Sequence, residues 1–206
     1  MRLLYFHGFA SGPSSGKAQY FKRRFAECGM TLEIPDLVEG KFEDLTITGQ
    51  LQVIERVARA EPVALLGSSM GGYLAALYAS KHPEVTKLVL MAPAFNFPQR
   101  WPMELGPEKS RQWQETGRLE VFHYAENRNA HIGWQLIGDA MKYDPAPNFV
   151  QPALIFHGTE DTVVPAVYSR DFAATHPNVI LRLLKSDHQL TDVLDVMWPE
   201  VQDFLS

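Results

Sequence analysis

The sequence has almost no cysteine and no long apolar segment. Cys28 is the one cysteine in 206 residues, which excludes an intramolecular disulfide and a cysteine-rich metal site. It lies at the end of an amphipathic segment, so we expect a buried thiol. No apolar run reaches the roughly 18 residues that a transmembrane helix needs. The first residues also lack the pattern of a secretory signal, and we therefore expect a cytoplasmic protein.

Positive charge is also scarce. Lysine and arginine number 19 against 24 acidic residues, a net charge of −5. No long basic run is present, which argues against nucleic acid or an anionic membrane surface as a partner. The histidines do not show metal-ligand spacing such as His-x-x-x-His, so no metal site is predicted.

Short apolar runs alternate with amphipathic segments along the chain. This alternation, with 46% hydrophobic residues, predicts one α/β domain over residues 1–206. We expect a mostly parallel central sheet with helices on both faces. The predicted strands are 2–6, 31–34, 62–67, 86–91, 152–157 and 179–184, and the predicted helices are 17–28, 47–60, 70–81, 166–175 and 191–205.

Residues 94–149 interrupt this alternation. The segment is rich in proline and holds most of the tryptophans, and it is too long for a structureless loop. Residues 130–143 have the apolar spacing of a helix, so we predict an inserted helical cap. Its aromatic residues are expected either to pack against the sheet or to form the wall of an apolar substrate pocket. They are Phe95, Phe97, Trp101 and Trp134.

The sequence Gly67-Ser68-Ser69-Met70-Gly71 follows an apolar strand and precedes a helical pattern. This G-x-S-x-G arrangement is typical of a nucleophile elbow, in which a sharp strand–turn–helix raises a serine above the sheet edge. The glycines two positions before and two positions after the serine prevent steric collisions at the turn. We predict that Ser69 is a nucleophile and that the amide of Met70 is one oxyanion donor. The alternative is a tight turn with a purely structural role.

A serine nucleophile needs a base, and the base needs an acceptor that orients it. Asp161 follows a predicted strand and precedes a helix, and His188 lies between the last strand and the last helix. The chain order Ser69, Asp161, His188 is that of the α/β-hydrolase fold. His7 and His157 each end a strand, and we expect structural roles for both.

A second oxyanion donor is expected from the loop after the first strand, and we predict the amide of Phe9. The segment Gly12-Pro13-Ser14-Ser15-Gly16-Lys17-Ala18 resembles a phosphate loop, because it follows a strand and begins a helix. However, it has one residue too few between its glycines, and Ala18 stands where the metal-binding hydroxyl would be. We interpret it as a turn and a helix cap.

Four motifs together resemble the α/β-hydrolase superfamily, and most closely the small bacterial YqiA-like esterases. They are Phe6-His7-Gly8-Phe9, Gly67-Ser68-Ser69-Met70-Gly71-Gly72, His157-Gly158-Thr159-Glu160-Asp161 and Ser186-Asp187-His188. The resemblance covers the whole chain and implies hydrolysis of small-molecule carboxylic esters without a cofactor. A thioesterase and a carbon–carbon bond lyase remain alternatives on the same fold, and a non-enzymatic binder of small ligands is a third.

Overall fold

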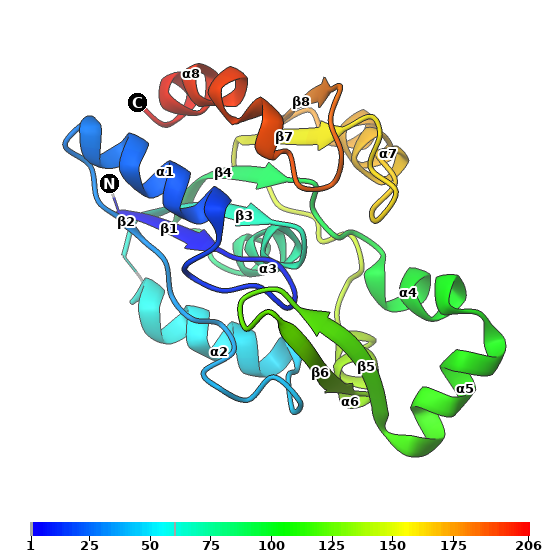
Figure 1. The fold of residues 1–206 in the computed structure, drawn as a ribbon. Coiled ribbons are helices and arrows are strands. Elements are labelled where there is room, and N and C mark those ends of the chain that lie inside the picture. The colour runs from blue at the N-terminus through cyan, green and yellow to red at the C-terminus, as the bar shows by residue number, and fades with distance from the viewer. Residues whose placement is uncertain (1, 60) are drawn as a thin grey trace.

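The computed structural model describes residues 2–59 and 61–206. Its main sheet has six parallel strands in the order β2-β1-β3-β4-β7-β8 (Figure 1). The strands are β1 (Arg2–Phe6), β2 (Leu32–Glu33), β3 (Val63–Ser68), β4 (Val85–Met91), β7 (Ala153–Gly158) and β8 (Val179–Leu184). This confirms the predicted fold class, and the second strand is shorter than expected.

Helices cover both faces of this sheet (Figure 1). One face packs against α1 (Gly16–Glu27) and α8 (Leu194–Leu205), which a short 3-10 turn, η1 (Thr191–Val193), precedes. The other packs against α2 (Ile47–Ala58), α3 (Met70–Ala79) and α7 (Val167–Thr175). No helix in the described residues is long and apolar enough to cross a membrane.

The two cores follow from the alternation of side chains along each strand. Leu3 and Tyr5 belong to the core under α1 and α8, whereas Leu4 and Phe6 belong to the core on the opposite face. Successive side chains of a strand point to opposite faces, so a strand covered on both sides must be apolar throughout. Because both faces of the sheet are packed, the carboxyl ends of its strands are held in fixed positions.

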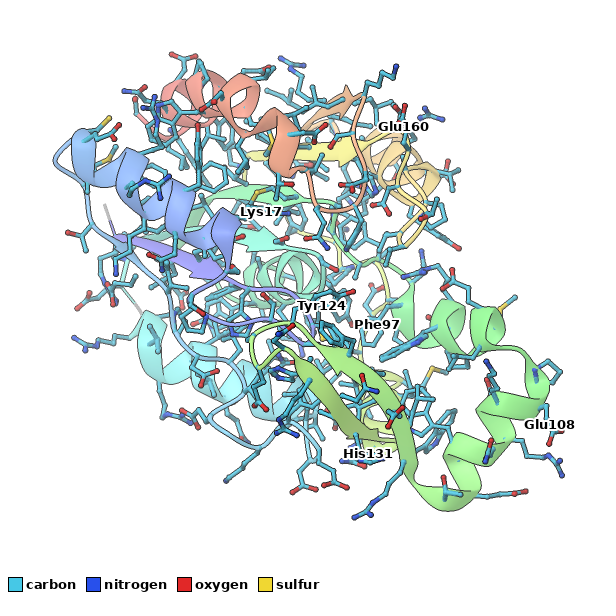
Figure 2. The ribbon with its side chains drawn as sticks, viewed as in Figure 1. Lys17, Phe97, Glu108, Tyr124, His131 and Glu160 are labelled. Carbon is cyan, nitrogen blue, oxygen red and sulfur yellow. The ribbon has the colours of Figure 1, made fainter. Side chains whose placement is uncertain are left out.

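The insertion between β4 and β7 contains both helices and strands. Its elements are α4 (Phe97–Leu105), α5 (Pro107–Thr116), the antiparallel pair β5 (Arg118–His123) and β6 (Arg128–Gly133), and α6 (Gln135–Ala140). In Figure 2, Glu108 of α5 lies at the outer side of the insertion, while Phe97 and Tyr124 lie toward the main sheet. The insertion is therefore not a purely helical cap.

The helix predicted over 130–143 was wrong in its first half. Residues 128–133 form β6, in which Ile132 pairs with Leu119 of β5. The buried indole of Trp113 donates a hydrogen bond from Nε1 to the carbonyl oxygen of Ile132, at 3.0 Å, and so ties α5 to the hairpin. Ile132 fits the apolar spacing of a helix equally well, but strand pairing decides its conformation. Met141 was expected to lie on the buried apolar face of this helix, but it is 57% exposed.

Cys28 also differs from its prediction. It follows the last turn of α1 and is exposed. Its sulfur accepts a hydrogen bond from Gln202 of α8 at 3.3 Å. The thiol therefore lies at the surface between two helices instead of in the core.

Candidate active site

Ser69 lies at the sharp turn between β3 and α3. Its φ of 54° and ψ of −117° are strained values for a residue with a side chain. A Cβ on Gly67 would overlap the carbonyl oxygen of Gly71, and one on Gly71 would overlap the carbonyls of Phe6 and His7. The two glycines therefore let the backbone approach closely enough to make this turn, as the sequence pattern predicts.

We expect Gly71→Ala to destabilise the protein by about 3 kcal/mol or more, because the new methyl group would meet backbone atoms that cannot move aside. Urea unfolding followed by circular dichroism measures this free energy.

Gly138→Ala is the matched control. Gly138 lies exposed in α6, and a Cβ there would meet nothing within 4 Å. This variant should gain up to about 1 kcal/mol, because alanine is the better helix former. Equal stability of the two variants would show that close packing at the elbow is not required.

A chain of hydrogen bonds joins Ser69, His188 and Asp161. Nε2 of His188 lies 3.0 Å from Oγ of Ser69, and its Nδ1 lies 2.7 Å from Oδ2 of Asp161. The carboxylate can only accept, so Nδ1 carries the proton and Nε2 is left to accept from the hydroxyl. The structure thus brings the three predicted catalytic side chains together in the geometry that a nucleophile, a base and an orienting acid require.

The carboxylate of Asp161 is buried and fully hydrogen-bonded. Its Oδ1 accepts from the amides of Val163 and Val164, both at 2.8 Å, and its Oδ2 interacts with His188 and His157. Burial acts to raise its pKa, but the hydrogen bonds from the two histidines and from the backbone outweigh burial. The pKa therefore lies well below its usual range, and Asp161 stays ionised at neutral pH.

His157 was predicted to be structural, but it touches the proposed catalytic acid. Its ring is fully buried, and Nε2 lies 3.2 Å from Oδ2 of Asp161 and 2.8 Å from the carbonyl oxygen of Val164. Both partners accept, so Nε2 carries the proton and Nδ1 accepts from the Ser169 hydroxyl at 2.8 Å. His157 therefore helps to hold Asp161 in place through the same carboxylate oxygen that His188 contacts. The sequence signal for this role is weak, since any histidine at the end of a strand would fit.

His7 braces the loop after β1, as predicted. Its Nε2 accepts a hydrogen bond from the amide of Leu37 at 3.1 Å, and Nδ1 lies 3.1 Å from the carbonyl oxygen of Gly8.

The loops that carry Asp161 and His188 are held against each other by the backbone. The amide of Thr159 donates to the carbonyl of Leu184 at 2.8 Å, and that of Glu160 donates to Ser186 at 3.0 Å. A Cβ on Gly158 would overlap the carbonyl of Ser186. Glycine at this position therefore allows the close approach that places the acid beside the base.

The two predicted oxyanion donors lie on segments that flank Ser69. Met70 is the first residue of α3, and Phe9 lies in the loop after β1. A Cβ on Gly8 would come within 3.4 Å of Cβ of Ser69, so this loop passes directly beside the nucleophile. Within residues 2–59 and 61–206, neither amide donates a hydrogen bond to the protein. Both are therefore available to a bound oxygen atom.

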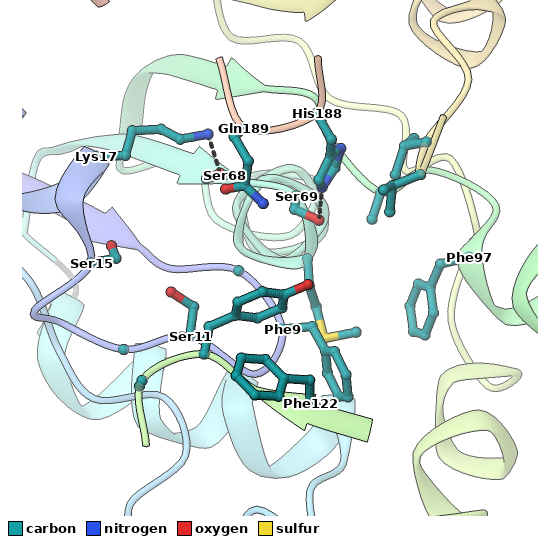
Figure 3. A pocket seen from close by; sticks show the side chains of 18 of the residues that line it. Phe9, Ser11, Ser15, Lys17, Ser68, Ser69, Phe97, Phe122, His188 and Gln189 are labelled. Carbon is teal, nitrogen blue, oxygen red and sulfur yellow. Dashed lines mark hydrogen bonds between the residues drawn. The ribbon is translucent and has the colours of Figure 1, made fainter. Parts of the chain in front are cut away.

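A cavity of about 950 Å³ opens beside Ser69 and His188 (Figure 3). Phe97 and Trp101 of α4 line it, as predicted. The expectation was wrong for Phe95, which is fully buried and stacks on Phe172, with ring centroids 4.5 Å apart. It was also wrong for Trp134, which packs edge-on against Trp113 outside the lining. The sequence locates aromatic residues in the insertion, but only packing decides which of them face the cavity.

The hairpin of the insertion forms another wall of the cavity. Tyr124 and Ala125, which follow β5, line it and donate hydrogen bonds from their amides to the carbonyl of Ala10, at 2.8 and 3.3 Å. The hairpin is thus attached to the loop that carries Phe9. The hairpin was not predicted from the sequence, although residues 118–123 show the alternation of a strand.

The sequence matches the model of one protein family over residues 2–205, almost its whole length. The chain belongs to the uncharacterised protein family UPF0227. Comparison of this UPF0227 chain with curated proteins finds no significant match.

Solved structures show the same fold for this UPF0227 protein. Alpha/beta hydrolase domain-containing protein 10 from mouse is 20% identical with a TM-score of 0.83, over 98% of this chain and 88% of that one. Est1E from Butyrivibrio proteoclasticus, solved with ferulic acid bound, is also 20% identical, with a TM-score of 0.82 over 100% and 88%. The monoacylglycerol lipase of Paleococcus ferrophilus is 16% identical, with a TM-score of 0.73 over 98% and 93%. These structures confirm the predicted α/β-hydrolase fold.

The titratable residues that the structure of this UPF0227 chain describes do not gather into a metal site. No group of three or more histidine, cysteine, aspartate or glutamate side chains suited to a metal ion occurs in the part of the chain that the structure describes.

Proposed function

We propose that this protein is a serine hydrolase that cleaves carboxylic esters of small molecules. The observation that carries the proposal is the continuous hydrogen-bonded chain from Ser69 Oγ through His188 to the ionised Asp161. It ends at a cavity large enough for a small organic ligand. The monoacylglycerol lipase that shares the fold adds support.

In the first half-reaction, Oγ of Ser69 attacks the carbonyl carbon of the ester while Nε2 of His188 takes the hydroxyl proton. The amides of Phe9 and Met70 donate hydrogen bonds to the carbonyl oxygen, on which negative charge develops. Met70 begins α3, so the positive end of the helix also faces this charge. Asp161 stabilises the imidazolium of His188 without taking its proton. His188 then protonates the leaving alcohol, and the acyl group remains on Ser69.

In the second half-reaction, water replaces the alcohol. His188 removes a proton from the water, which attacks the acyl carbon, and the tetrahedral intermediate collapses to release the acid and restore the Ser69 hydroxyl. The same residues serve both steps, so no cofactor is required. The apolar wall formed by Phe97, Trp101 and Val121 gives the substrate a hydrophobic contact surface.

Hydrolysis of p-nitrophenyl esters from acetate to octanoate tests this function. We expect turnover of at least one ester, with a burst of p-nitrophenol when deacylation is slow, and a chain-length profile that reports the size of the cavity. The oxygen ester and the thioester of the best acyl group are then compared.

A higher kcat/KM for the thioester would assign the protein to thioester hydrolysis. Absence of turnover on all of these substrates by the folded protein would contradict the proposal and favour a lyase or a ligand-binding protein.

A further inference from the structure

A lysine is buried in the wall of the cavity beside the nucleophile. Lys17, in the first turn of α1, is only 6% exposed and lines the cavity. Its Nζ donates one hydrogen bond, to Oγ of Ser68 at 3.0 Å (Figure 3). An ammonium group has three donors, so two remain for a partner that is not part of the protein's own side chains.

Among the described residues, no acidic side chain forms an ion pair with Lys17. Across the described ranges, every carboxylate is more than 4.0 Å from its Nζ. Arg100, the other basic residue of the cavity wall, is neutralised by Glu104 at 2.7 Å. Asp187 and Asp161 act on this ammonium group only from beyond ion-pair distance, and a buried cation without a contact counter-charge is costly. Within the chain that the structure describes, the positive charge of Lys17 in the cavity wall therefore has no direct ion-pair partner.

Other hydrogen-bond donors line the same cavity. They include Ser11, Ser14 and Ser15, of which Figure 3 labels Ser11 and Ser15. Ser15 is the N-cap residue of α1, yet its side chain makes no capping hydrogen bond. The first amides of a helix lack intrahelical partners and carry partial positive charge. The cavity wall thus combines an ammonium group, serine hydroxyls and the start of a helix.

The ammonium group is still the main form of Lys17 at neutral pH. Burial lowers its pKa to about 8, and the charges of Asp187 and Asp161, which act in the opposite direction, only partly offset burial. A bound anion would favour the protonated form further.

We propose that Lys17 and the first turn of α1 bind an anionic group, a carboxylate or a phosphate, carried by the substrate that Ser69 attacks. This inference rests on the proposed ester hydrolysis. Ser68, which accepts the hydrogen bond from the ammonium group, lines the same cavity as Ser69, so one substrate could place its ester at Ser69 and its anion at Lys17. The apolar wall on α4 would hold the uncharged part.

The proposal also explains the sequence Gly12-Pro13-Ser14-Ser15-Gly16-Lys17. Its resemblance to a phosphate loop is too poor for nucleotide binding, but the fold places this segment in the cavity wall. Backbone amides at a helix start, with a lysine beside them, suit an anion regardless of the rest of the motif.

Binding to Ser69→Ala, which should not hydrolyse esters, tests the subsite alone. Isothermal titration calorimetry compares 4-hydroxybenzoate and 4-hydroxyphenyl phosphate with uncharged 4-hydroxybenzamide. We expect the better anion to bind roughly 10- to 100-fold more tightly than the amide. Lys17→Met in the same background should abolish most of this preference. Lys22→Met is the matched control, since Lys22 is exposed on the same helix and its loss changes the net charge equally.

Kinetics then locates the anion relative to the ester. 4-Acetoxybenzoate carries the negative charge on the alcohol part of the ester, and its uncharged counterpart is 4-acetoxybenzamide. Monomethyl succinate carries the charge on the acyl part, and its uncharged counterpart is methyl succinamate. We expect one charged ester to have the higher kcat/KM of its pair, with a ratio that falls roughly 10- to 100-fold in Lys17→Met and not in Lys22→Met.

Equal binding of the anions and the amide would overturn the proposal, as would a preference that survives in folded Lys17→Met. If Lys17→Met does not fold, the difference in affinity between the anions and the amide in Ser69→Ala alone decides whether the subsite binds anions. Absence of hydrolysis of any ester, together with Lys17-dependent anion binding, would reject the esterase function and leave an anion site.

Discussion

Ser69→Ala is expected to lower kcat for ester hydrolysis by about a millionfold, and the oxyanion donors and substrate binding should still leave a rate roughly 1,000- to 10,000-fold above that of the uncatalysed reaction. The variant lacks the oxygen that forms the acyl-enzyme, while His188 and Asp161 remain in place. The fold should survive, because alanine removes only a hydroxyl group from the turn. Steady-state hydrolysis of the best p-nitrophenyl ester measures the change.

Ser80→Ala is the matched control for this variant. Ser80 lies at the opposite end of α3, where its hydroxyl bonds to the carbonyl of Leu77. It should keep the kcat of the wild type. Residual activity above one per cent in pure Ser69→Ala would mean that another group is the nucleophile.

Asp161→Asn is expected to lower kcat by about 10,000-fold while the protein remains folded. The asparagine oxygen can still accept from the amides of Val163 and Val164. Its NH₂ group, however, would donate to Nδ1 of His188 and so put the imidazole proton on Nε2. In that tautomer Nε2 cannot take the proton of Ser69.

Glu160→Gln provides the comparison, because Glu160 is the exposed neighbour and loses the same charge. It should retain wild-type turnover. If Asp161→Asn retained it too, Asp161 would not be the residue that orients His188.

The pH dependence of stability gives Asp161→Asn a second readout. The pKa of Asp161 is lower in the folded protein than the ordinary value of about 4 expected on unfolding. Its charge therefore stabilises the fold above about pH 4, and this contribution is lost as the pH falls through the folded pKa. The difference in unfolding free energy between wild type and variant should be constant from about pH 5 to 8 and shrink below about pH 4.

The main sheet and the grouping of Ser69, Asp161 and His188 could be predicted because each depends on local patterns. A strand covered on both faces must be largely apolar, as Val63 to Leu66 are, and a sharp turn needs small residues around Ser69. The order of Ser69, Asp161 and His188 along the chain then limits how a sheet can bring them together.

The features that could not be predicted depend on contacts between distant segments. Residues 128–133 fit a helix by spacing, but pairing with residues 118–123 makes them a strand. Lys17 looks like an ordinary lysine of a helix start, and only the fold places its ammonium group against Ser68. The second partner of Asp161, His157, is likewise decided by packing.

Intact-mass spectrometry after reaction with a fluorophosphonate tests the central claim most directly. Such probes react with activated serine nucleophiles, so the account predicts one adduct on the wild type and none on Ser69→Ala. No adduct on the folded wild type, or the same adduct on Ser69→Ala, would contradict the assignment of Ser69 as an activated nucleophile.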